Sequence, residues 1–165
     1  MENEILKIGN ELLKAIAEPM IAFDESLIIL ANKMYTMIKT YQGVGLAAPQ
    51  IGISKRLIVY GSENNKRYPN TGDIPFNALV NPVILSYSPE QEEFFEGCLS
   101  TPNIRGSVKR SISIAGYAQD LTGKIVTFEE KGFLARIIQH EVDHLNGISF
   151  LQRINDNSRI VYSSN

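Results

Sequence analysis

Residues 131–147, KGFLARIIQHEVDHLNG, predict the helix around which the fold is organised. The apolar residues of this stretch recur at three- and four-residue intervals, as in a helix with one buried face. They are Leu134, Ile137, Ile138, Val142 and Leu145. Gly147 stands where a glycine commonly ends a helix. We therefore expect a helix from about residue 131 to residue 146.

The same stretch contains His140-Glu141-Val142-Asp143-His144, which matches the pattern H-E-x-x-H. Residues four positions apart lie on one side of a helix, so both imidazoles can bind one metal ion. Glu141 is offset from them and can reach a water on that ion as a general base. No other histidine occurs in the chain. The pattern predicts a metal-dependent amidohydrolase, although paired histidines on such a helix are often surface or core residues.

A catalytic site of this kind generally has three protein ligands and one position for water. Phe150 stands where an extended form of the motif has a third histidine, and Asp156 is the only acidic residue after His144. The remaining candidate is Cys98, the single cysteine, which could also be a buried apolar residue or a nucleophile. A thiolate with two imidazoles suits Zn, Fe(II), Co or Ni better than Mg or Ca.

The rest of the sequence predicts one α+β domain, residues 1–165, built on antiparallel or mixed sheets. A second amphipathic helix should begin at Asp24 or Ser26 and run to about Thr40. Strands are expected at residues 56–60, 78–86, 111–117 and 124–128. Residues 61–75 should form a solvated surface loop, and about 155–165 a loosely held tail. Regular βαβ alternation is absent, which favours the α+β class.

Composition indicates neither a nucleic-acid nor a membrane partner. The 16 basic and 18 acidic residues nearly cancel, so no strongly basic surface for nucleic acid is expected. The longest apolar runs fall far short of the ~20 residues that a membrane span needs. The N-terminus lacks the basic residues of a secretory signal, and a cytoplasmic location is therefore expected.

Three segments together resemble the signatures of the peptide deformylase family. They are Gly43-Val44-Gly45-Leu46-Ala47-Ala48-Pro49-Gln50 (G-x-G-x-A-A-x-Q), Glu96-Gly97-Cys98-Leu99-Ser100 (E-G-C-L-S) and Gln139 to His144 (Q-H-E-x-D-H). The resemblance implies an α+β fold with antiparallel and mixed strands around a central metal-carrying helix. It implies hydrolytic removal of the formyl group from N-formylmethionyl nascent peptides, at the ribosome exit. It also implies one divalent ion, natively Fe(II), with Zn, Ni or Co as possible occupants.

Carried over residue by residue, the resemblance assigns a role to each motif position. Cys98, His140 and His144 correspond to metal ligands, and Glu141 to the acid–base. Gln50 and the backbone N–H of Leu99 correspond to donors to the developing oxyanion. The expected substrate-binding residues are Gly43, Val44, Gly45, Gly97, Arg105 and Ile137, with Ile137 lining a methionine pocket. Arg110 should pair with Glu96, and Asp143 should orient a basic partner or a histidine ring.

Arg136 departs from the family pattern, because an aliphatic residue commonly lines the pocket at its position. A charge there is expected to narrow or polarise the methionine pocket. Residues 61–75 are longer than the family minimum, and the terminal helix of many members is expected to be absent or reduced. Two rival functions are a peptidase that cleaves internal bonds and a non-catalytic binding protein stapled by a metal ion.

Overall fold

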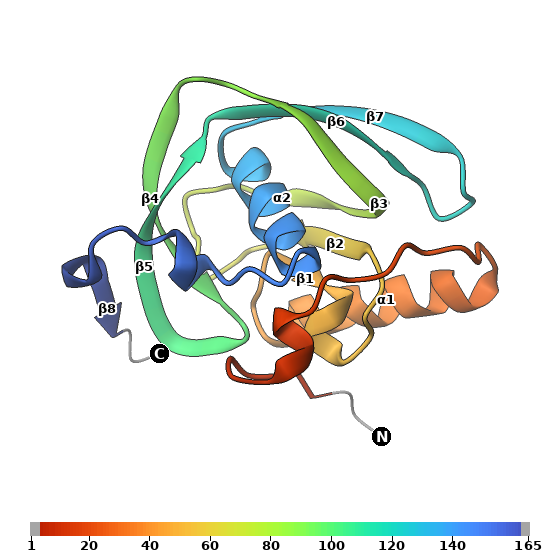
Figure 1. Cartoon of the computed structure of the whole chain (residues 1–165), viewed down its shortest axis with the longest axis horizontal. Coiled ribbons are helices and arrows are strands. Elements are labelled where there is room, and N and C mark those ends of the chain that lie inside the picture. The colour runs from red at the N-terminus through yellow and green to blue at the C-terminus, as the bar shows by residue number, and fades with distance from the viewer. Residues whose placement is uncertain (1–3, 163–165) are drawn as a thin grey trace.

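The computed structural model describes residues 4–162 and contains two antiparallel sheets and two α-helices (Figure 1). The larger sheet has the strand order β1-β2-β3-β6-β7, and the smaller one has the order β4-β5-β8. The strands are β1 (Gly45–Ala47), β2 (Leu57–Ser62), β3 (Ile74–Tyr87), β4 (Gln91–Cys98), β5 (Thr101–Ser111), β6 (Ser113–Gln119), β7 (Ile125–Lys131) and β8 (Ile160–Tyr162). The expected α+β fold built on antiparallel sheet is confirmed. Among the described residues, the only parallel pairing is an isolated bridge between Glu18 and Lys55.

Both α-helices lie where the apolar periodicity predicts them. Helix α1 (Glu25–Thr40) begins after Asp24, whose carboxylate accepts the Ser26 N–H and so caps the helix. Helix α2 (Gly132–Leu145) ends just before Gly147, which has a φ of 71°. That left-handed conformation favours glycine, because a Cβ atom would be strained there.

The strand pair β1–β2 is buried on both faces, between α1 and α2. Successive side chains of a strand point to opposite faces, and β2 follows this rule with apolar residues on both. Leu57 and Val59 pack with α1, whereas Ile58 and Tyr60 pack with α2. Each fully buried aliphatic side chain of this kind contributes ~1.5 to 3 kcal/mol. In Figure 1, α2 accordingly lies in the interior, while α1 lies on the outer side of the larger sheet.

Helix α2 buries its polar residues as completely as its apolar ones. Every residue from Ala135 to Leu145 is buried, including Arg136, Gln139, His140, Glu141, Asp143 and His144. Buried polar groups are costly unless they are hydrogen-bonded or paired. The helix therefore needs a set of matching polar partners, and most of these come from β4 and β5.

The hairpin of β4 and β5 is absent from the strands expected from apolar runs, and only the resemblance, through Glu96–Ser100, indicates a strand there; β2, β3, β6 and β7 match the four expected runs. Strand β4 reads QEEFFEGC and β5 contains Pro102 and Gly106, so neither has the apolar alternation of a typical strand. Cross-strand pairing stabilises the hairpin instead. Glu93 lies opposite Lys109 and also pairs with Arg159 at 2.6 Å.

The segment between β2 and β3 is a mostly exposed surface loop, as expected for residues 61–75, but part of it is buried. Asn65 and Tyr68 are buried, and Gly61 and Ser62 belong to β2. The Asn65 side chain donates to the Gly43 carbonyl at 2.8 Å and accepts the Tyr68 N–H at 3.1 Å. This amide anchors the loop to the segment before β1.

Both ends of the described chain pack against the region between Gln50 and Gly106. Leu6 N–H donates to the Gln50 carbonyl at 2.7 Å, and Ile8 N–H donates to the Ser100 carbonyl at 2.9 Å. At the other end, β8 pairs with residues 104–106 of β5, where a loosely held tail from about 155 is expected from sequence. The edge of β5 that does not pair with β4 has unpaired backbone N–H and C=O groups, and the β8 residues Ile160 and Val161 pair with them. Residues 163–165 of the expected tail lie outside the described residues.

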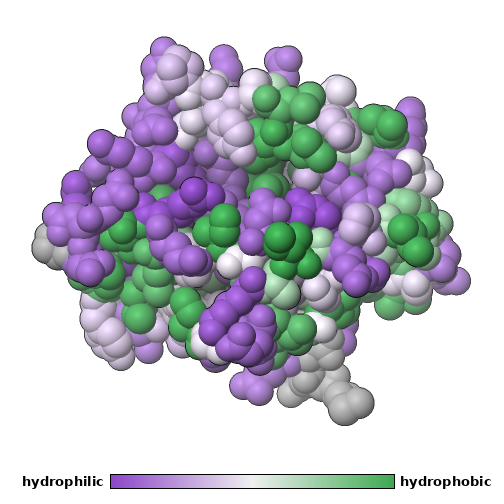
Figure 2. Space-filling model, in the orientation of Figure 1, coloured by the Kyte–Doolittle hydropathy of each residue, from purple (hydrophilic) through white to green (hydrophobic). Residues whose placement is uncertain are grey.

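After α2, the described chain forms only two 3-10 turns, η3 (Phe150–Arg153) and η4 (Asn157–Arg159), and β8. This agrees with the expected reduction of the terminal helix. Figure 2 shows the hydrophobic side chains of one face as small groups separated by hydrophilic ones. Within residues 4–162, no helix is long and apolar enough to cross a membrane.

Candidate active site

A thiol and two imidazoles meet where β4 ends beside α2. Cys98 is the last residue of β4, and His140 and His144 lie one turn apart on α2. One potential ligand atom of each lies within 4.8 Å of those of the other two. Cys98 Sγ is 3.3 Å from His144 Nε2, and all three residues are buried. The three residues predicted as metal ligands are thus brought together.

Glu141 shares a pocket with Cys98 and His140. Its Oε2 is buried and has no hydrogen-bond partner among the described residues. Burial raises the pKa of Glu141 to about 7, although the charges of His140 and His144 act in the opposite direction. A carboxyl group with a pKa near neutrality and an unpaired oxygen is suited to accept a proton and return it.

Glu96 fixes the His140 ring from the side away from Cys98. Its Oε2 lies 2.9 Å from His140 Nδ1, which leaves Nε2 available to the cluster. A carboxylate on the second ring nitrogen commonly orients a metal-binding histidine. Arg110 donates to both oxygens of Glu96, with Nη2 3.0 Å from Oε2. The expected pair of Arg110 and Glu96 is confirmed, and both side chains are buried.

Arg110 also donates to Asp143, so its guanidinium lies between the carboxylates of Glu96 and Asp143. Asp143 Oδ2 accepts from Arg110 Nη1 at 2.9 Å, and Asp143 Oδ1 accepts from Arg153 Nη2 at 2.6 Å. The expectation that Asp143 orients a basic partner is confirmed. Burial alone would raise the pKa of Glu96, but hydrogen bonds and charges from His140 and Arg110 lower it well below its usual range. Glu96 is therefore an anion at neutral pH.

The cluster favours the thiolate form of Cys98. Burial alone would raise the pKa of Cys98, but the charges and hydrogen bonds of His144 and His140 lower it well below its usual value. Burial alone would likewise lower the pKa of His140, but hydrogen bonds with Cys98 and Glu96 raise it well above its usual value. The thiolate is the form of cysteine that binds metals.

Gln50 directs its amide nitrogen toward Cys98. It lies in the short 3-10 turn η2 (Ala48–Ile51), where its Oε1 accepts the Ala47 N–H at 2.8 Å. Its Nε2 donates to Ser100 Oγ at 3.1 Å and lies 3.4 Å from Cys98 Sγ. Because the backbone N–H of Ala47 can only donate, the amide oxygen of Gln50 must face it, and the amide nitrogen therefore faces the cluster.

Ten of the twelve predicted site residues line one pocket. They are Gly43, Val44, Gly45, Gln50, Gly97, Cys98, Leu99, Ile137, His140 and Glu141. His144 instead lies behind Cys98, where both line a second hollow with Ser100. Arg105 does not line the pocket directly, but its guanidinium lies 4.7 Å from the ring centre of Tyr68, which does.

Gly45 permits Glu141 to lie against the backbone of β1. A Cβ atom at Gly45 would be 2.5 Å from Glu141 Oε1 and 2.9 Å from Ile137 Cγ2. At Gly43, a Cβ atom would meet the end of the Leu99 side chain instead, at 2.9 Å. Gly45 therefore makes room for the Glu141 carboxylate, and Gly43 makes room for the Leu99 side chain.

Arg136 lines the pocket, but its charge is directed away into the hairpin of β4 and β5. Its Nη1 donates to Glu96 Oε1 at 2.8 Å and to the Val108 carbonyl at 3.0 Å. Its Nη2 donates to the Glu92 carbonyl at 2.6 Å. Arg136 therefore ties α2 to β4 and β5, and its guanidinium shares the Glu96 carboxylate with Arg110 and His140.

An aromatic group in the pocket is missed by sequence reasoning. Tyr68, Phe94 and Phe133 line it, with ring centres 5.2 Å apart for Tyr68 and Phe133 and 5.5 Å for Phe94 and Phe133. Only Phe133 carries a signal, because it lies one helical turn before Ile137 and so on the same face. Tyr68 comes from the loop expected to be solvated, and Phe94 comes from the unpredicted hairpin.

The donor set fits a divalent transition-metal ion. A thiolate and two imidazoles are soft to borderline ligands, and three protein ligands leave a coordination position open, as in catalytic sites. Glu141 lines the same pocket, and its unpaired Oε2 could hydrogen-bond a water at that position. The chemistry supported by these groups is hydrolysis of an amide-type bond.

Comparisons with known proteins identify relatives along nearly the whole chain. The family model described as polypeptide deformylase matches residues 2–159. Peptide deformylase 1 of Bordetella pertussis is 42% identical over 164 residues, which are 99% of this chain and 93% of that protein. The Met-Ala-Ser-bound crystal structure of class I type b peptide deformylase from Acinetobacter baumannii has a TM-score of 0.88 and 44% identity, covering 92% of this chain and 97% of that one. The peptide deformylase of Thermotoga maritima has a TM-score of 0.83 and 39% identity, covering 93% and 98%.

Proposed function

Because this chain belongs to the peptide deformylase family, whose metal-dependent enzymes remove the N-terminal formyl group, we propose that its buried cluster holds the ion for that reaction. The proposed ligands are Cys98, His140 and His144, and the helix α2 is the central element that carries two of them. One observation carries the proposal. Three ligand atoms within 4.8 Å of one another share their surroundings with a buried carboxylate that has a pKa of about 7.

We propose Fe(II) as the native ion, with Zn, Ni and Co as possible occupants. The thiolate and imidazole donors favour all four over Mg or Ca. Air oxidises Fe(II) to Fe(III) but does not oxidise Ni(II), and the oxidisable Cys98 thiolate is common to both samples, so an iron enzyme should lose activity in air faster than a nickel-loaded one. Elemental analysis of anaerobically purified protein identifies the ion, and zinc as the only metal found there would contradict iron.

When bound, the ion supplies Lewis acidity, which polarises the formyl carbonyl and makes a coordinated water more acidic. Glu141 then takes a proton from the attacking water and returns it to the leaving amine as the C–N bond breaks. Gln50 Nε2 and the backbone N–H of Leu99 donate to the oxygen that becomes negative. Donors of this kind lower the barrier by ~3 to 4 kcal/mol each. Formate and a free N-terminus result.

The substrate is proposed to lie as an extended strand between residues 43–45 and Gly97. Three of these four positions, Gly43, Gly45 and Gly97, are glycines, and the absence of side chains there allows a peptide to approach and hydrogen-bond in strand fashion. Ile137, with the aromatic group described above, forms an apolar pocket for the methionine side chain. The relative from A. baumannii was solved with Met-Ala-Ser bound, which supports a peptide that begins with methionine. Arg105 is proposed to bind the peptide beyond methionine.

The setting of the reaction is also proposed. Formylated N-termini occur on newly made polypeptides, so the enzyme should act in the cytoplasm and close to the ribosome exit. Residues 1–165 are proposed to form a single catalytic domain, since both sheets contribute residues to one site. Co-sedimentation with ribosomes carrying a nascent chain would test the association.

The decisive experiment replaces Glu141 and measures formate and metal separately. Glu141→Gln should retain the ion, because Glu141 is not a proposed ligand, and should lower turnover of formyl-Met-Ala-Ser by about 10² to 10⁴-fold. The control Glu129→Gln changes an exposed carboxylate on β7 and should leave turnover unaltered. Unchanged turnover in Glu141→Gln would refute the proposed base, and full metal content in Cys98→Ala would refute the proposed third ligand.

The two rival functions are separated by the same samples. An internal peptidase would cut an unblocked peptide into fragments and release no formate from a formylated one. A metal-stapled binding protein would release no formate and would show the same inactivity before and after Glu141→Gln. The proposed deformylase releases formate and leaves internal peptide bonds intact.

A further inference from the structure

Two arginines, Arg67 in the pocket lining and Arg105 beside it, have no ion-pair partner among the described residues. Arg67 belongs to the loop between β2 and β3, and Arg105 belongs to β5. The other arginines close to the site, Arg110, Arg136 and Arg153, pair with Glu96 or Asp143. Within residues 4–162, neither Arg67 nor Arg105 forms an ion pair, and both are half-buried.

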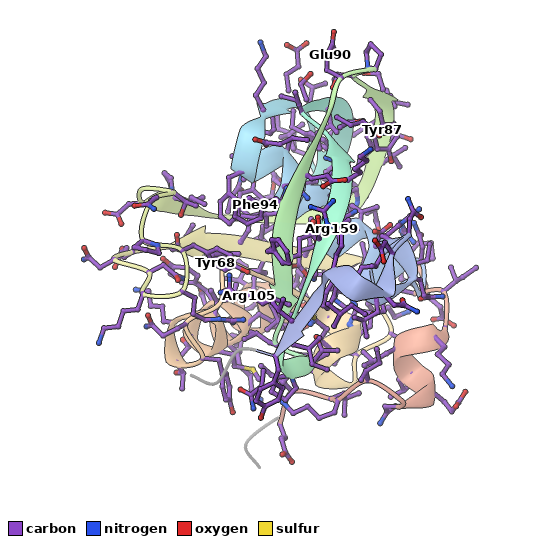
Figure 3. The ribbon with its side chains drawn as sticks, turned by 90° about the vertical axis from the view of Figure 1, so that its left-hand side faces the viewer. Tyr68, Tyr87, Glu90, Phe94, Arg105 and Arg159 are labelled. Atoms are coloured by element: carbon purple, nitrogen blue, oxygen red, sulfur yellow. The ribbon has the colours of Figure 1, made fainter. Side chains whose placement is uncertain are left out.

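Tyr68 and the backbone hold these two guanidinium groups around Gly97. Arg105 Nη2 donates to the Arg67 carbonyl at 3.2 Å, and its guanidinium lies 4.7 Å from the ring centre of Tyr68. The Tyr68 hydroxyl accepts the Gly97 N–H at 3.3 Å. Arg67 Nη2 lies 2.9 Å from the place of a Cβ atom on Gly97. Figure 3 shows Tyr68 and Arg105 beside each other below Phe94, next to β4.

The local charge at this position is positive. The nearest carboxylate along β4, Glu96, is buried and already accepts from Arg110, Arg136 and His140. Lys66 adds a further exposed cation next to Arg67. Two like charges held near each other repel, and an anion placed between them relieves that repulsion. Stacking on Tyr68 orders the Arg105 side chain in advance, so less entropy is lost on binding.

We propose that Arg67 and Arg105 form a subsite for an acidic side chain in one of the two residues that follow the formylated methionine. This inference rests on the proposed function, because Gly97 lines the pocket in which the methionine is placed. An extended peptide advances ~3.3 Å per residue, so the residues just after methionine pass the arginines at Gly97. Guanidinium groups suit a carboxylate, to which they can donate two parallel hydrogen bonds.

The test compares peptides that differ only in one charge. Formyl-Met-Ala-Asp-amide and formyl-Met-Ala-Asn-amide place the charge at the third residue, and formyl-Met-Asp-Ala-amide and formyl-Met-Asn-Ala-amide place it at the second. The amides remove the terminal carboxylate, which could occupy the same subsite. We expect kcat/KM to favour the Asp peptide of one pair by roughly 5- to 20-fold at low ionic strength. The preference should lie in KM and fall toward one at ~1 M salt, where the Debye length is ~3 Å.

Three variants locate the preference. Arg67→Gln and Arg105→Gln should each reduce the Asp/Asn ratio, and the double variant should abolish it. Lys124→Gln removes the same charge from the exposed turn between β6 and β7 and should leave the ratio at the wild-type value. The ratio within one variant is informative even where the overall rate changes.

The outcomes also separate this inference from the proposed function. Equal kcat/KM for Asp and Asn in both pairs, with formate released from all four peptides, would overturn the acidic subsite and leave the deformylase assignment intact. An Asp preference that survives the double variant would overturn the role of the two arginines. Absence of formate from every peptide would instead refute the proposed function, and the subsite would fail with it.

Discussion

The close approach of Gly45 to Glu141 makes Gly45→Ala the sharpest test of the site geometry. The added Cβ atom would lie 2.5 Å from Glu141 Oε1, whereas an ordinary contact is 3.4–4 Å. The carboxyl group must therefore move by ~1 Å, and a misplacement of that size lowers catalytic rates by about 10²-fold. The backbone at Gly45 is not in the left-handed region, so the substitution itself imposes no backbone strain. Overpacking costs a further ~1 to 3 kcal/mol of stability.

The assay for Gly45→Ala is formate release from formyl-Met-Ala-Ser, with metal content and thermal unfolding measured on the same sample. We expect kcat/KM to fall about 10²-fold while the metal content is retained and the protein stays folded. The comparison variant is Gly43→Ala, whose Cβ atom meets only the movable end of the Leu99 side chain. Its loss should be several times smaller. If the two variants lose activity equally, or if Gly45→Ala is fully active, the proposed place of the Glu141 carboxyl group is wrong.

Three further predictions concern stability. Arg136→Met should lower the free energy of unfolding by about 1 to 3 kcal/mol in urea titration, because it removes a buried hydrogen bond to Glu96 and two to backbone carbonyls; an unchanged value would show that the network is not stabilising. Burial raises the pKa of Tyr60 to about 12, so the unfolded chain, with a pKa of ~10, loses its proton first as the pH rises. Stability should therefore fall between pH 10 and 12, and Tyr60→Phe should lessen that fall by ~1 to 2 kcal/mol; equal alkaline losses in both proteins would contradict it. Gly147→Ala should lower the melting temperature by about 4 °C or more, because φ is 71° and the new Cβ atom would press against the Lys14 carbonyl; a melting temperature like that of the wild type would refute this.

The elements with local periodicity could be predicted from the sequence. Helices α1 and α2 have apolar residues at three- and four-residue spacing, and β2, β3, β6 and β7 contain β-branched or aromatic runs. The predicted metal ligands could be found because two of them share one helix motif and the third is the only cysteine. The other predicted site residues lie in or near the three signature segments, and most of them line the pocket.

The remaining elements depend on tertiary contacts that leave little local pattern. The β4–β5 hairpin is held by cross-strand charges and by Arg136 from α2, and neither appears as an apolar alternation. Tyr68 reads as part of a polar loop, and it is buried because Asn65 ties that loop to Gly43. The sequence shows that Arg136 departs from the family pattern. It does not show where the guanidinium points, because that direction is set by the backbone carbonyls of Glu92 and Val108 in the hairpin.

The distance in sequence between Cys98 and His144, 46 residues, gives the proposed ion a second consequence. An ion held by both residues ties the smaller sheet to α2 and closes a loop of that length, as a disulfide would. For a permanent link, loop-closure entropy corresponds to ~4 kcal/mol. A chelator would then act on this protein as a reducing agent acts on a disulfide-bonded one. Metal supply in the cell would set how long the enzyme survives, as well as how fast it works.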